Sequence, residues 1–258
     1  DYEPKQAGSL KEIERGDIRF EHVSFSYDGK RDVLKEISFE VKNGQTIAFV
    51  GHTGSGKSSI INLFMRFYEF DRGQILIDGQ DIKDYSQEAL RKSIGLVLQE
   101  PFLYHGTIAS NIRMYHEELT DEEIRQAAEF VDVADFIESL PGGYDHPVTE
   151  RGSTLSTGQR QLLAFARTIA AQPKILILDE ATANIDQETE EMIQNSLKKM
   201  RQGRTTIAIA HRLSTIQDAD CIYVLDKGKI IESGNHDQLI ALGGTYKKMY
   251  DLQAGMMK

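Results

Sequence analysis

Residues 51–58, with the sequence GHTGSGKS, have the composition and spacing of a phosphate-binding loop. Glycines at such positions let backbone amides turn inward around phosphate oxygens, and the positive end of the following helix adds to the attraction. Lys57 is expected to reach the β- and γ-phosphates of a nucleotide, and the Ser58 hydroxyl is expected to bind Mg²⁺. A simple Gly-Ser turn that opens a helix is the alternative, but it explains neither the lysine nor the spacing. The residues expected to contact the nucleotide here are Gly51, Thr53, Gly54, Ser55, Gly56, Lys57, Ser58 and Ser59.

Two consecutive acids, Asp179 and Glu180, directly follow the apolar run Ile175–Leu178. A buried strand over this run would place both carboxylates at the carboxyl edge of a sheet, where open α/β sheets bind their ligands. Asp179 is expected to hold Mg²⁺ through water, and Glu180 is expected to orient or deprotonate an attacking water. An acidic pair after a strand is by itself more often a helix cap. Together with the phosphate loop, the pair favours phosphoryl transfer.

The segments that must position these motifs alternate between strand-like and helix-like patterns. Ile18–Phe25 alternates apolar and polar residues, as a half-buried strand does, and the spacing from Lys57 to about Phe67 predicts a helix. Short apolar runs elsewhere are typical of buried parallel strands, with helices between several of them, which indicates an α/β layered core. The other predicted strands are Ile37–Val41, Thr46–Val50, Ile94–Leu98, Lys174–Leu178, Thr205–Ala210 and Cys221–Leu225.

The stretch from Gly106 to Ala171 breaks this alternation, because it contains helical periodicity and no good strand. Thr120, followed by Glu123, predicts a capping box at the start of its first helix. The stretch is therefore expected to be a helical insertion in the α/β domain. Helices are predicted at Asp121–Phe130 and Val133–Leu140, and near the C-terminus at Thr245–Gln253.

Composition limits the classes of partner. The 258 residues carry a formal net charge of −10, which argues against a nucleic-acid partner but not against a polyphosphate bound by loop amides. The single cysteine, Cys221, excludes a disulfide framework and a cysteine-rich metal site. No run approaches the ~20 apolar residues that span a bilayer. The charged residues 1–15 lack the apolar centre of a secretion signal and predict a linker from an upstream region.

The segment Leu155-Ser156-Thr157-Gly158-Gln159 gives the most discriminating resemblance. It resembles the signature motif of the ATP-binding cassette family, which other phosphate-loop enzymes lack. The phosphate loop and the acidic pair add to the resemblance to this family. The resemblance extends from Ile18 to Gln253. Four further segments, each unremarkable alone, follow in the family's order: Tyr27 resembles the aromatic residue that stacks on adenine, Gln99 the Q-loop glutamine, Asn184-Ile185-Asp186 the D-loop and His211 the switch histidine.

This resemblance implies ATP and Mg²⁺ as cofactors, and an ATPase with a phosphate-loop (RecA-like), mainly parallel core. An antiparallel β-subdomain and an inserted α-helical subdomain are implied as well. Residues 1–17 are then a linker and 18–258 the nucleotide-binding domain. Within it, 18–98 and 172–258 form the core and β-subdomain, and 99–171 form the helical subdomain with the signature.

The family's mechanism implies a role for each matching residue. His211 would contact the γ-phosphate and hold the water against Glu180. The signature would face the ATP of a second such domain, so that a head-to-tail dimer encloses two ATP molecules. The resulting catalytic residues are Lys57, Gln99, Glu180 and His211; the metal ligands are Ser58, Gln99 and Asp179; the remaining nucleotide contacts are Tyr27, Ser156, Gly158, Gln159 and Asp186.

Several segments resemble the exporter branch of the family, in which a membrane-spanning region precedes this domain on the same chain. This implies a soluble fragment of a membrane protein, located at the cytoplasmic face of the cell membrane. Residues near Phe102, Leu103 and Tyr104 are candidates for docking onto that region. The segments that carry the resemblance are Gly106-Thr107-Ile108, Asn111-Ile112, Thr149–Gly152, Ala210–Thr215 and Gly244–Gln253.

Thr157 departs from the family pattern, which has glycine at this position, and a β-branched residue adds bulk there. With Glu180 and His211 present, this favours one half of a heterodimeric exporter that has one weak site, while a homodimer that tolerates Thr157 remains the alternative. A soluble ATPase of the same family is a second alternative, although no coiled-coil insertion or tandem cassette is present. A GTPase lacks support because the chain has no Asn-Lys-x-Asp sequence, and a small-molecule kinase would leave the signature unexplained.

Overall fold

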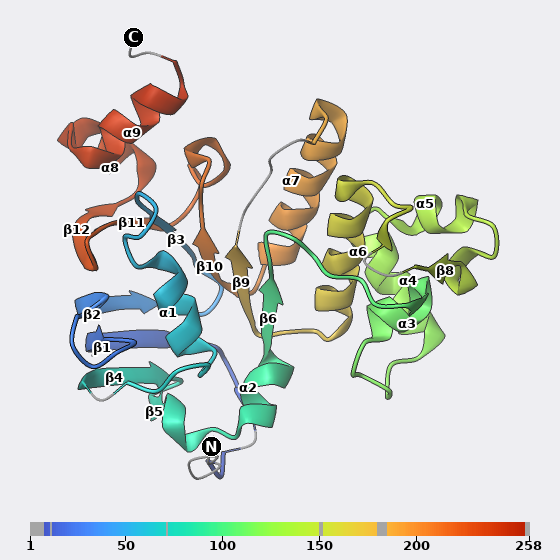
Figure 1. The fold of residues 1–258 in the computed structure, drawn as a ribbon, viewed down its shortest axis with the longest axis horizontal. Coiled ribbons are helices and arrows are strands. Elements are labelled where there is room, and N and C mark those ends of the chain that lie inside the picture. Colours follow the sequence, from blue (N-terminus) through green and yellow to red (C-terminus); the bar gives the residue numbers. More distant parts are fainter. Residues whose placement is uncertain (1–7, 11, 71, 150–151, 180–184, 256–258) are drawn as a thin grey trace. The chain divides into compact units, whose positions relative to one another are not determined.

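The computed structural model describes residues 8–10, 12–70, 72–149, 152–179 and 185–255. They form two compact units, and Figure 1 labels most of their helices and strands. Residues 99–171, expected to form the helical subdomain, all fall in unit 2, together with the segment Asp179–Gln202. Unit 1 comprises the described parts of Asp1–Ile94, Lys174–Leu178 and Gly203–Lys258, and unit 2 those of Gly95–Pro173 and Asp179–Gln202.

Unit 1 contains a four-stranded antiparallel sheet with the strand order β2-β1-β4-β5. β1 has the predicted bounds, whereas β2 begins at Leu34 rather than Ile37, because the alternation of buried residues reaches back to Leu34. Phe20 and Phe39 are paired across β1 and β2, and their rings stack with centroids 4.4 Å apart. The strands are β1 (Ile18–Phe25), β2 (Leu34–Val41), β4 (Arg72–Ile77) and β5 (Gln80–Asp81).

A second, six-stranded sheet has the order β12-β11-β3-β10-β9-β6. β3 pairs in parallel with both β10 and β11, and β12 is antiparallel to β11. Every residue of β3 and β10 is buried, which agrees with their apolar sequences. β9 and β6 each carry the chain from one unit to the other. The strands are β3 (Thr46–Val50), β6 (Ile94–Val97), β9 (Ile175–Asp179), β10 (Thr205–Ile209), β11 (Cys221–Asp226) and β12 (Lys229–Gly234).

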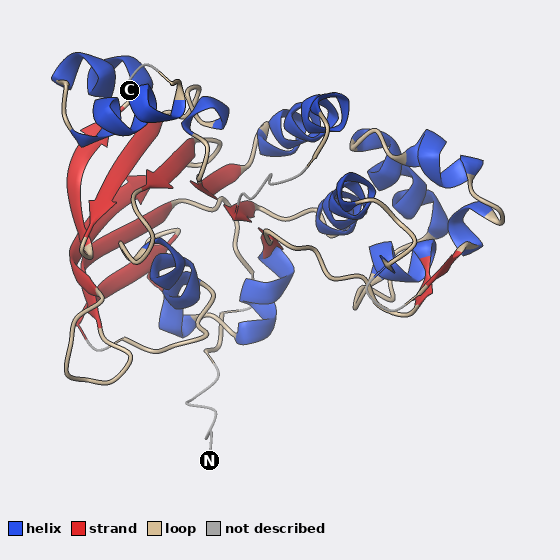
Figure 2. Cartoon of the chain, turned by 45° about the horizontal axis from the view of Figure 1, so that its top comes forward, coloured by secondary structure: helices blue, strands red, loops and turns tan. Residues whose placement is uncertain are grey.

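The helices of unit 1 lie beside these strands (Figure 2). The helix after β3 packs on the antiparallel sheet, where the ring of Phe64 lies 6.3 Å from that of Phe20. It ends at Phe64 rather than near Phe67, because Arg66 has a left-handed backbone with a φ of 52°. The helix Thr245–Gln253 has its predicted bounds. The helices are α1 (Lys57–Phe64), η1 (Ile82–Asp84), α2 (Gln87–Ser93), η4 (Leu213–Thr215), α8 (His236–Leu242) and α9 (Thr245–Gln253).

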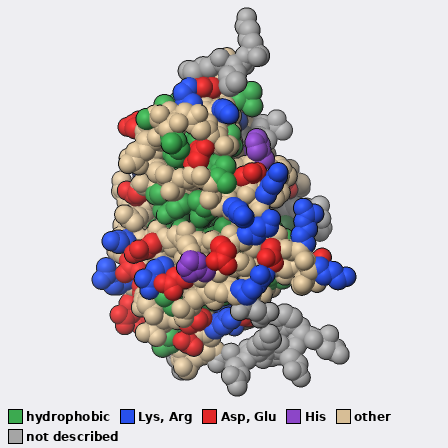
Figure 3. All heavy atoms as spheres, turned by 90° about the vertical axis from the view of Figure 1, so that its left-hand side faces the viewer, with side chains coloured by type: hydrophobic (Ala, Val, Ile, Leu, Met, Phe, Trp, Pro, Cys, Tyr) green, Lys and Arg blue, Asp and Glu red, His purple; other side chains and the backbone are tan. Residues whose placement is uncertain are grey.

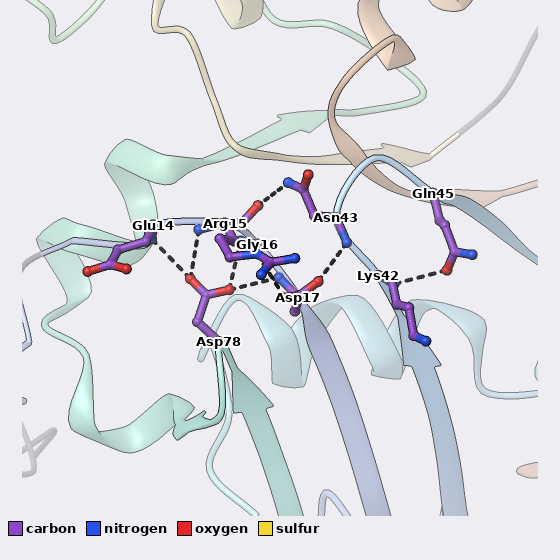
Figure 4. Close-up of polar contacts among 8 residues, drawn as sticks. All are labelled: Glu14, Arg15, Gly16, Asp17, Lys42, Asn43, Gln45 and Asp78. Carbon is purple, nitrogen blue, oxygen red and sulfur yellow. Dashed lines mark hydrogen bonds and ion pairs between the residues drawn. The ribbon is translucent and has the colours of Figure 1, made fainter.

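The described part of the N-terminal segment is held to the turn between β4 and β5 (Figure 4). The carboxylate of Asp78 accepts hydrogen bonds from four consecutive backbone N–H groups, those of residues 14–17, at 2.8–3.0 Å. The N–H of Asp78 in turn donates to the carbonyl of Asp17. Ile13 is buried, and the N–H of Leu10 donates to the carbonyl of Asp84. This segment is therefore an ordered part of unit 1.

Unit 2 is mainly helical. The predicted capping box is confirmed: the Thr120 hydroxyl accepts from Glu123 N–H, and the Glu123 carboxylate accepts from Thr120 N–H. A short two-stranded ladder, β7 (Gly106–Thr107) with β8 (Pro147–Val148), lies within the stretch expected to have no strand. The helices are α3 (Ile108–Arg113), α4 (Asp121–Phe130), α5 (Ala134–Ser139), η2 (Gly143–Asp145), α6 (Thr157–Ala170) and α7 (Gln187–Arg201).

Charge and hydropathy add two observations. Among the described residues, none of the helices is both long enough and apolar enough to cross a bilayer. On the face drawn in Figure 3, basic and acidic side chains are interspersed and do not gather into a stripe of one sign.

Candidate active site

The phosphate loop connects the central strand β3 to α1, and two of its glycines are required by their surroundings. Gly51 has a φ of 156°, and a Cβ there would overlap the carbonyl oxygen of Leu225. Gly56 is the N-cap of α1 with a φ of 111°, and a Cβ there would lie 2.8 Å from the Leu34 side chain. The sequence pattern therefore reflects a loop that only glycine can complete at these two points.

Lys57, the first residue of α1, folds back over the loop that precedes it. Its Nζ donates to the carbonyl oxygens of Gly51 at 2.5 Å and His52 at 3.1 Å, and lies 3.4 Å from the Ser55 hydroxyl. Lys57 is only 6% exposed, so its charge is concentrated within the loop. Thr53, Gly54 and Ser58 are exposed, which leaves the mouth of the loop accessible. The result is a preorganised cationic cradle suited to phosphate.

Tyr27 lies just after β1 in the same unit and is 47% exposed. Its hydroxyl is 2.9 Å from the Ser59 hydroxyl and accepts from the Asn62 amide at 3.0 Å. Its ring meets those of Phe25 and Tyr68 edge-on, with centroids 4.7 and 4.9 Å away. Ser59, expected to contact the nucleotide, is buried and bonds Tyr27; its contact with nucleotide stays a prediction. The structure thus links the base-stacking candidate to the helix that follows the phosphate loop.

His211 follows β10 in unit 1, and its side chain is exposed. Its carbonyl oxygen accepts a hydrogen bond from the Gln253 amide at 2.8 Å. β10 and β3 run parallel and side by side, so the phosphate loop and His211 both follow the carboxyl ends of adjacent strands. This is the edge at which open α/β sheets bind ligands.

In unit 2, Gln99 and Asp179 lie together although they are far apart in the sequence. The Gln99 Nε2 donates to Asp179 Oδ1 at 3.2 Å. Both side chains carry oxygen atoms of the type that Mg²⁺ prefers. Glu180 and Asn184 lie outside the described residues.

The signature segment forms the N-terminus of α6. The Ser156 hydroxyl accepts from Gln159 N–H at 3.1 Å, and the Gln159 side chain accepts from Ser156 N–H at 2.9 Å, so the two residues form a capping box. Thr157 is exposed at the first helical position, and its hydroxyl accepts from Arg160 at 3.3 Å. The backbone of this turn therefore accommodates threonine without the left-handed conformation that would require glycine.

Gly158 joins the signature to the start of α7. A Cβ on Gly158 would overlap the Cγ2 atom of Thr189 in the first turn of α7. Asp186 caps that helix, since its carboxylate accepts from Thr189 N–H at 2.9 Å, and this backbone hydrogen bond lowers the pKa of Asp186. The signature and the D-loop aspartate are thus connected through one close contact between helices, which sequence spacing did not reveal.

Two further residues of unit 2 hold the aromatic loop around Phe102 and Tyr104. Arg167 of α6 donates to the carbonyl oxygens of Asn111 at 2.8 Å and Phe102 at 2.9 Å. The Asn111 side chain bonds both the N–H and the carbonyl of Tyr104. Burial lowers the pKa of Arg167. Asn111 is only 3% exposed. The sequence gives no indication of this hydrogen-bond network beyond a polar residue on the apolar face of α3.

A phosphate loop after the central strand of a mainly parallel sheet, with an antiparallel sheet and a helical unit, defines an ATP-binding domain of the phosphate-loop class. Residues 34–183, more than half of the chain, match the ABC transporter family. The chain therefore belongs to the ABC transporter family, and it is an ATP-binding ATPase domain with that family's fold.

Two named proteins and one solved structure are similar to this chain. The chain is 72% identical to the putative ABC transporter ATP-binding protein exp8 of Streptococcus pneumoniae, over 99% of this chain and 44% of that protein. It is 54% identical to the probable multidrug resistance ABC transporter ATP-binding/permease protein YheH of Bacillus subtilis, over 97% of this chain and 37% of that protein.

Among solved structures, a bacterial Atm1-family ABC exporter with ATP bound superposes with a TM-score of 0.89 and 43% identity, over 98% of this chain and 44% of that one. The chain thus spans less than half the length of each of these three proteins.

Proposed function

We propose that this chain hydrolyses ATP to drive export through a membrane-spanning region carried by the same full-length protein, at the cytoplasmic face of the cell membrane. The observation that carries the hydrolytic part is the Lys57 cradle, with its three contacts to the phosphate loop. The names of the relatives, an ATP-binding/permease protein and an ABC exporter, support the transport part.

Mg²⁺ fits the donor chemistry of the proposed site. Ser58, Gln99 and Asp179 would supply a hydroxyl, an amide and a carboxylate oxygen, and within unit 2 the Gln99 Nε2 donates to Asp179 Oδ1 at 3.2 Å. When bound with ATP, the metal would neutralise phosphate charge during transfer. Lys57 and the loop amides would hold the phosphates in place, and Tyr27 would stack on adenine with the ring fixed by its neighbours.

Water activation is proposed for Glu180 and His211. Glu180 would accept hydrogen bonds from the attacking water and draw off its proton, while His211 would hold the γ-phosphate and the water in line. Phosphoryl transfer depends on positioning and charge stabilisation, so both residues act without a covalent intermediate.

We further propose that the active form is a head-to-tail pair of domains. Ser156 is exposed at the N-terminus of α6, a 14-residue helix whose positive end suits the γ-phosphate of a partner-bound ATP. Gly158 and Gln159 follow in the first turn of α6, and Asp186 caps α7, whose first turn contacts α6 at Gly158. The exposed Thr157 would stand between this helix end and the partner's phosphate, so we favour a heterodimer in which this composite site is the weaker one.

A homodimer is the second candidate, and one observation favours it. Thr157 sits at a helical position with its hydroxyl turned to Arg160, so its side chain need not obstruct an incoming phosphate. A soluble ATPase without a membrane region has no such support, because the similar proteins include an ATP-binding/permease protein.

Replacing Glu180 with Gln tests the hydrolytic mechanism. ATP affinity should stay within about twofold, turnover should fall by about 100-fold or more, and the variant should accumulate as an ATP-bound dimer. Size-exclusion chromatography with ATP and a phosphate-release assay measure both effects. Unchanged turnover would remove Glu180 from the proposed role.

A further inference from the structure

Gln253, the last residue of α9, bonds the backbone on both sides of Arg212. Its Nε2 donates to the carbonyl oxygen of His211 at 2.8 Å, and its Oε1 accepts from the N–H of Leu213 at 2.9 Å. A single primary amide thus satisfies one acceptor and one donor of the segment that carries the proposed switch histidine. The two bonds fix the peptide groups that flank Arg212.

One of these two bonds caps the short helix that follows His211. Leu213 begins the short helix η4, and its N–H is one of the helix-start donors that lack a partner within the helix. Arg212 is the N-cap of η4, but its side chain makes no capping hydrogen bond. Gln253 therefore supplies from a distant part of the chain the cap that the local sequence does not supply.

The far end of α9 is itself well anchored. Tyr246 is fully buried, and its hydroxyl lies 2.8 Å from the His236 ring nitrogen. The Glu232 carboxylate accepts hydrogen bonds from the N–H groups of Thr245 and Tyr246 at the start of the helix. Tyr246 and Gln253 are seven residues apart, or about two turns, so they lie on one face of the helix. Burial of Tyr246 thereby fixes the direction in which Gln253 projects.

We propose that Gln253 is a positioning residue for ATP hydrolysis and acts by holding His211 in place. The inference rests on the proposed role of His211. The side chain of His211 is exposed and projects from a backbone that is not part of a strand or an α-helix. Without the amide of Gln253, the peptide on each side of Arg212 gains freedom, and the imidazole spends less time where it contacts the γ-phosphate and the attacking water.

The test compares ATP hydrolysis by the 258-residue chain and its variants at several protein concentrations, so that a change in association is seen separately. Gln253→Ala should lower kcat by about three- to tenfold, the equivalent of one or two net hydrogen bonds, with KM within about twofold. Hydrogen exchange at the Leu213 amide should accelerate. Gln217→Ala is the matched control: it removes the 3.4 Å contact to the Tyr250 hydroxyl on α9 and should leave kcat unchanged.

A double mutant then separates positioning from general damage. In the background of His211→Ala, the additional change Gln253→Ala should have no further effect, because the residue through which it acts is gone. An equal loss in both backgrounds would overturn the inference, as would an unchanged kcat in Gln253→Ala when His211→Ala is impaired. If His211→Ala itself turned over normally, the proposed role of His211 would fail first, and the positioning role would fail with it.

Discussion

The ring of Tyr27 is held in place although nearly half of the residue is exposed. Phe25 and Tyr68 support it from the side, and its hydroxyl is tied to Ser59 and Asn62 of α1. The contacts to α1 link the ring to the helix that the phosphate loop opens. An adenine base that stacks on this ring would therefore be held at a fixed distance from the phosphates, because the ring is hydrogen-bonded to α1 and α1 directly follows the phosphate loop.

Replacing Tyr27 with Ala should weaken ATP binding by about 1 kcal/mol, or about fivefold, through the loss of stacking. Tyr27→Phe is the matched control, because it keeps the ring and removes only the hydroxyl bonded to Ser59 and Asn62. We expect it to bind ATP within about twofold of the parent chain. Isothermal titration calorimetry measures both affinities. Equal affinity in Tyr27→Ala would identify Tyr27 as an ordinary surface aromatic.

Asp28, the next residue, orders the turn that follows. Hydrogen bonds from the N–H groups of Lys30 and Arg31, and from the Ser26 hydroxyl, lower the pKa of Asp28 from its ordinary 3.8 to about 2. A depressed pKa means that this stabilisation is complete above pH 3.8 and is lost as the pH falls through about 2.

Titration of the side-chain carboxyl carbon of Asp28 by NMR should therefore give a pKa near 2. The ring signals of Tyr27 should shift over the same range, because the turn begins beside that ring. Asp28→Asn cannot titrate, so its Tyr27 signals should not respond in this range. A carboxyl midpoint at the ordinary value would contradict the hydrogen-bonded turn.

At the scale of elements, the helices α6 and α7 of unit 2 contact each other at a glycine, Gly158. The start of α6 and the first turn of α7 approach so closely that Gly158 leaves room only for the methyl group of Thr189. The signature and the cap of α7 at Asp186 are therefore parts of one packed junction. A change in the position of either helix start would be transmitted to the other.

Gly158→Ala should destabilise the chain by about 1–3 kcal/mol, the usual cost of forcing an extra carbon into a packed contact. Thr189→Ser removes the methyl group that would be overlapped and keeps the hydroxyl, so combining the two changes should recover part of the loss. Thr157→Ala, at an exposed neighbouring position, is the control and should change stability little. The midpoints of urea unfolding measure the stability of each variant. Strictly additive effects of Gly158→Ala and Thr189→Ser would argue against the junction.

Asp78 joins the N-terminal segment to the turn between β4 and β5. It holds four amides of residues 14–17, and its own φ of 51° puts it in a conformation that alanine adopts poorly. Asp78→Ala should therefore accelerate hydrogen exchange at these amides and destabilise unit 1 by about 2–4 kcal/mol. Asp84→Ala, at an exposed acid on the neighbouring η1, keeps its backbone bond to Leu10 and should have little effect. Protection of amides 14–17 that is equal in both variants would rule out the clamp.

At the scale of the whole molecule, local patterns were sufficient to predict much of the fold. The phosphate loop, the bounds of β1 and α9 and the capping box at Thr120 each depend on residues adjacent in the sequence. The bonds of Gln253 to the backbone at residues 211–213, and the clamp at Asp78, join residues 40–64 positions apart. No local spacing encodes such pairs, because their geometry depends on how the elements pack.

The same limit applies to the partner of this chain. Thr157 is exposed and unstrained within its own domain, so its effect must arise from whatever approaches the N-terminus of α6. If the natural partner is a different chain, a dimer of two copies of this chain would have Thr157 in both signatures and therefore two weakened sites. Its ATPase activity should then be low and should rise little with protein concentration. Thr157→Gly should increase this activity by relieving bulk beside the phosphate. Initial rates from micromolar to about 100 micromolar chain measure both effects, with Ser153→Ala, upstream of the signature, as the control. Robust activity that rises steeply with concentration, and that Thr157→Gly leaves unchanged, would instead establish the homodimer, since second-order dependence requires that two copies of this chain build a competent site.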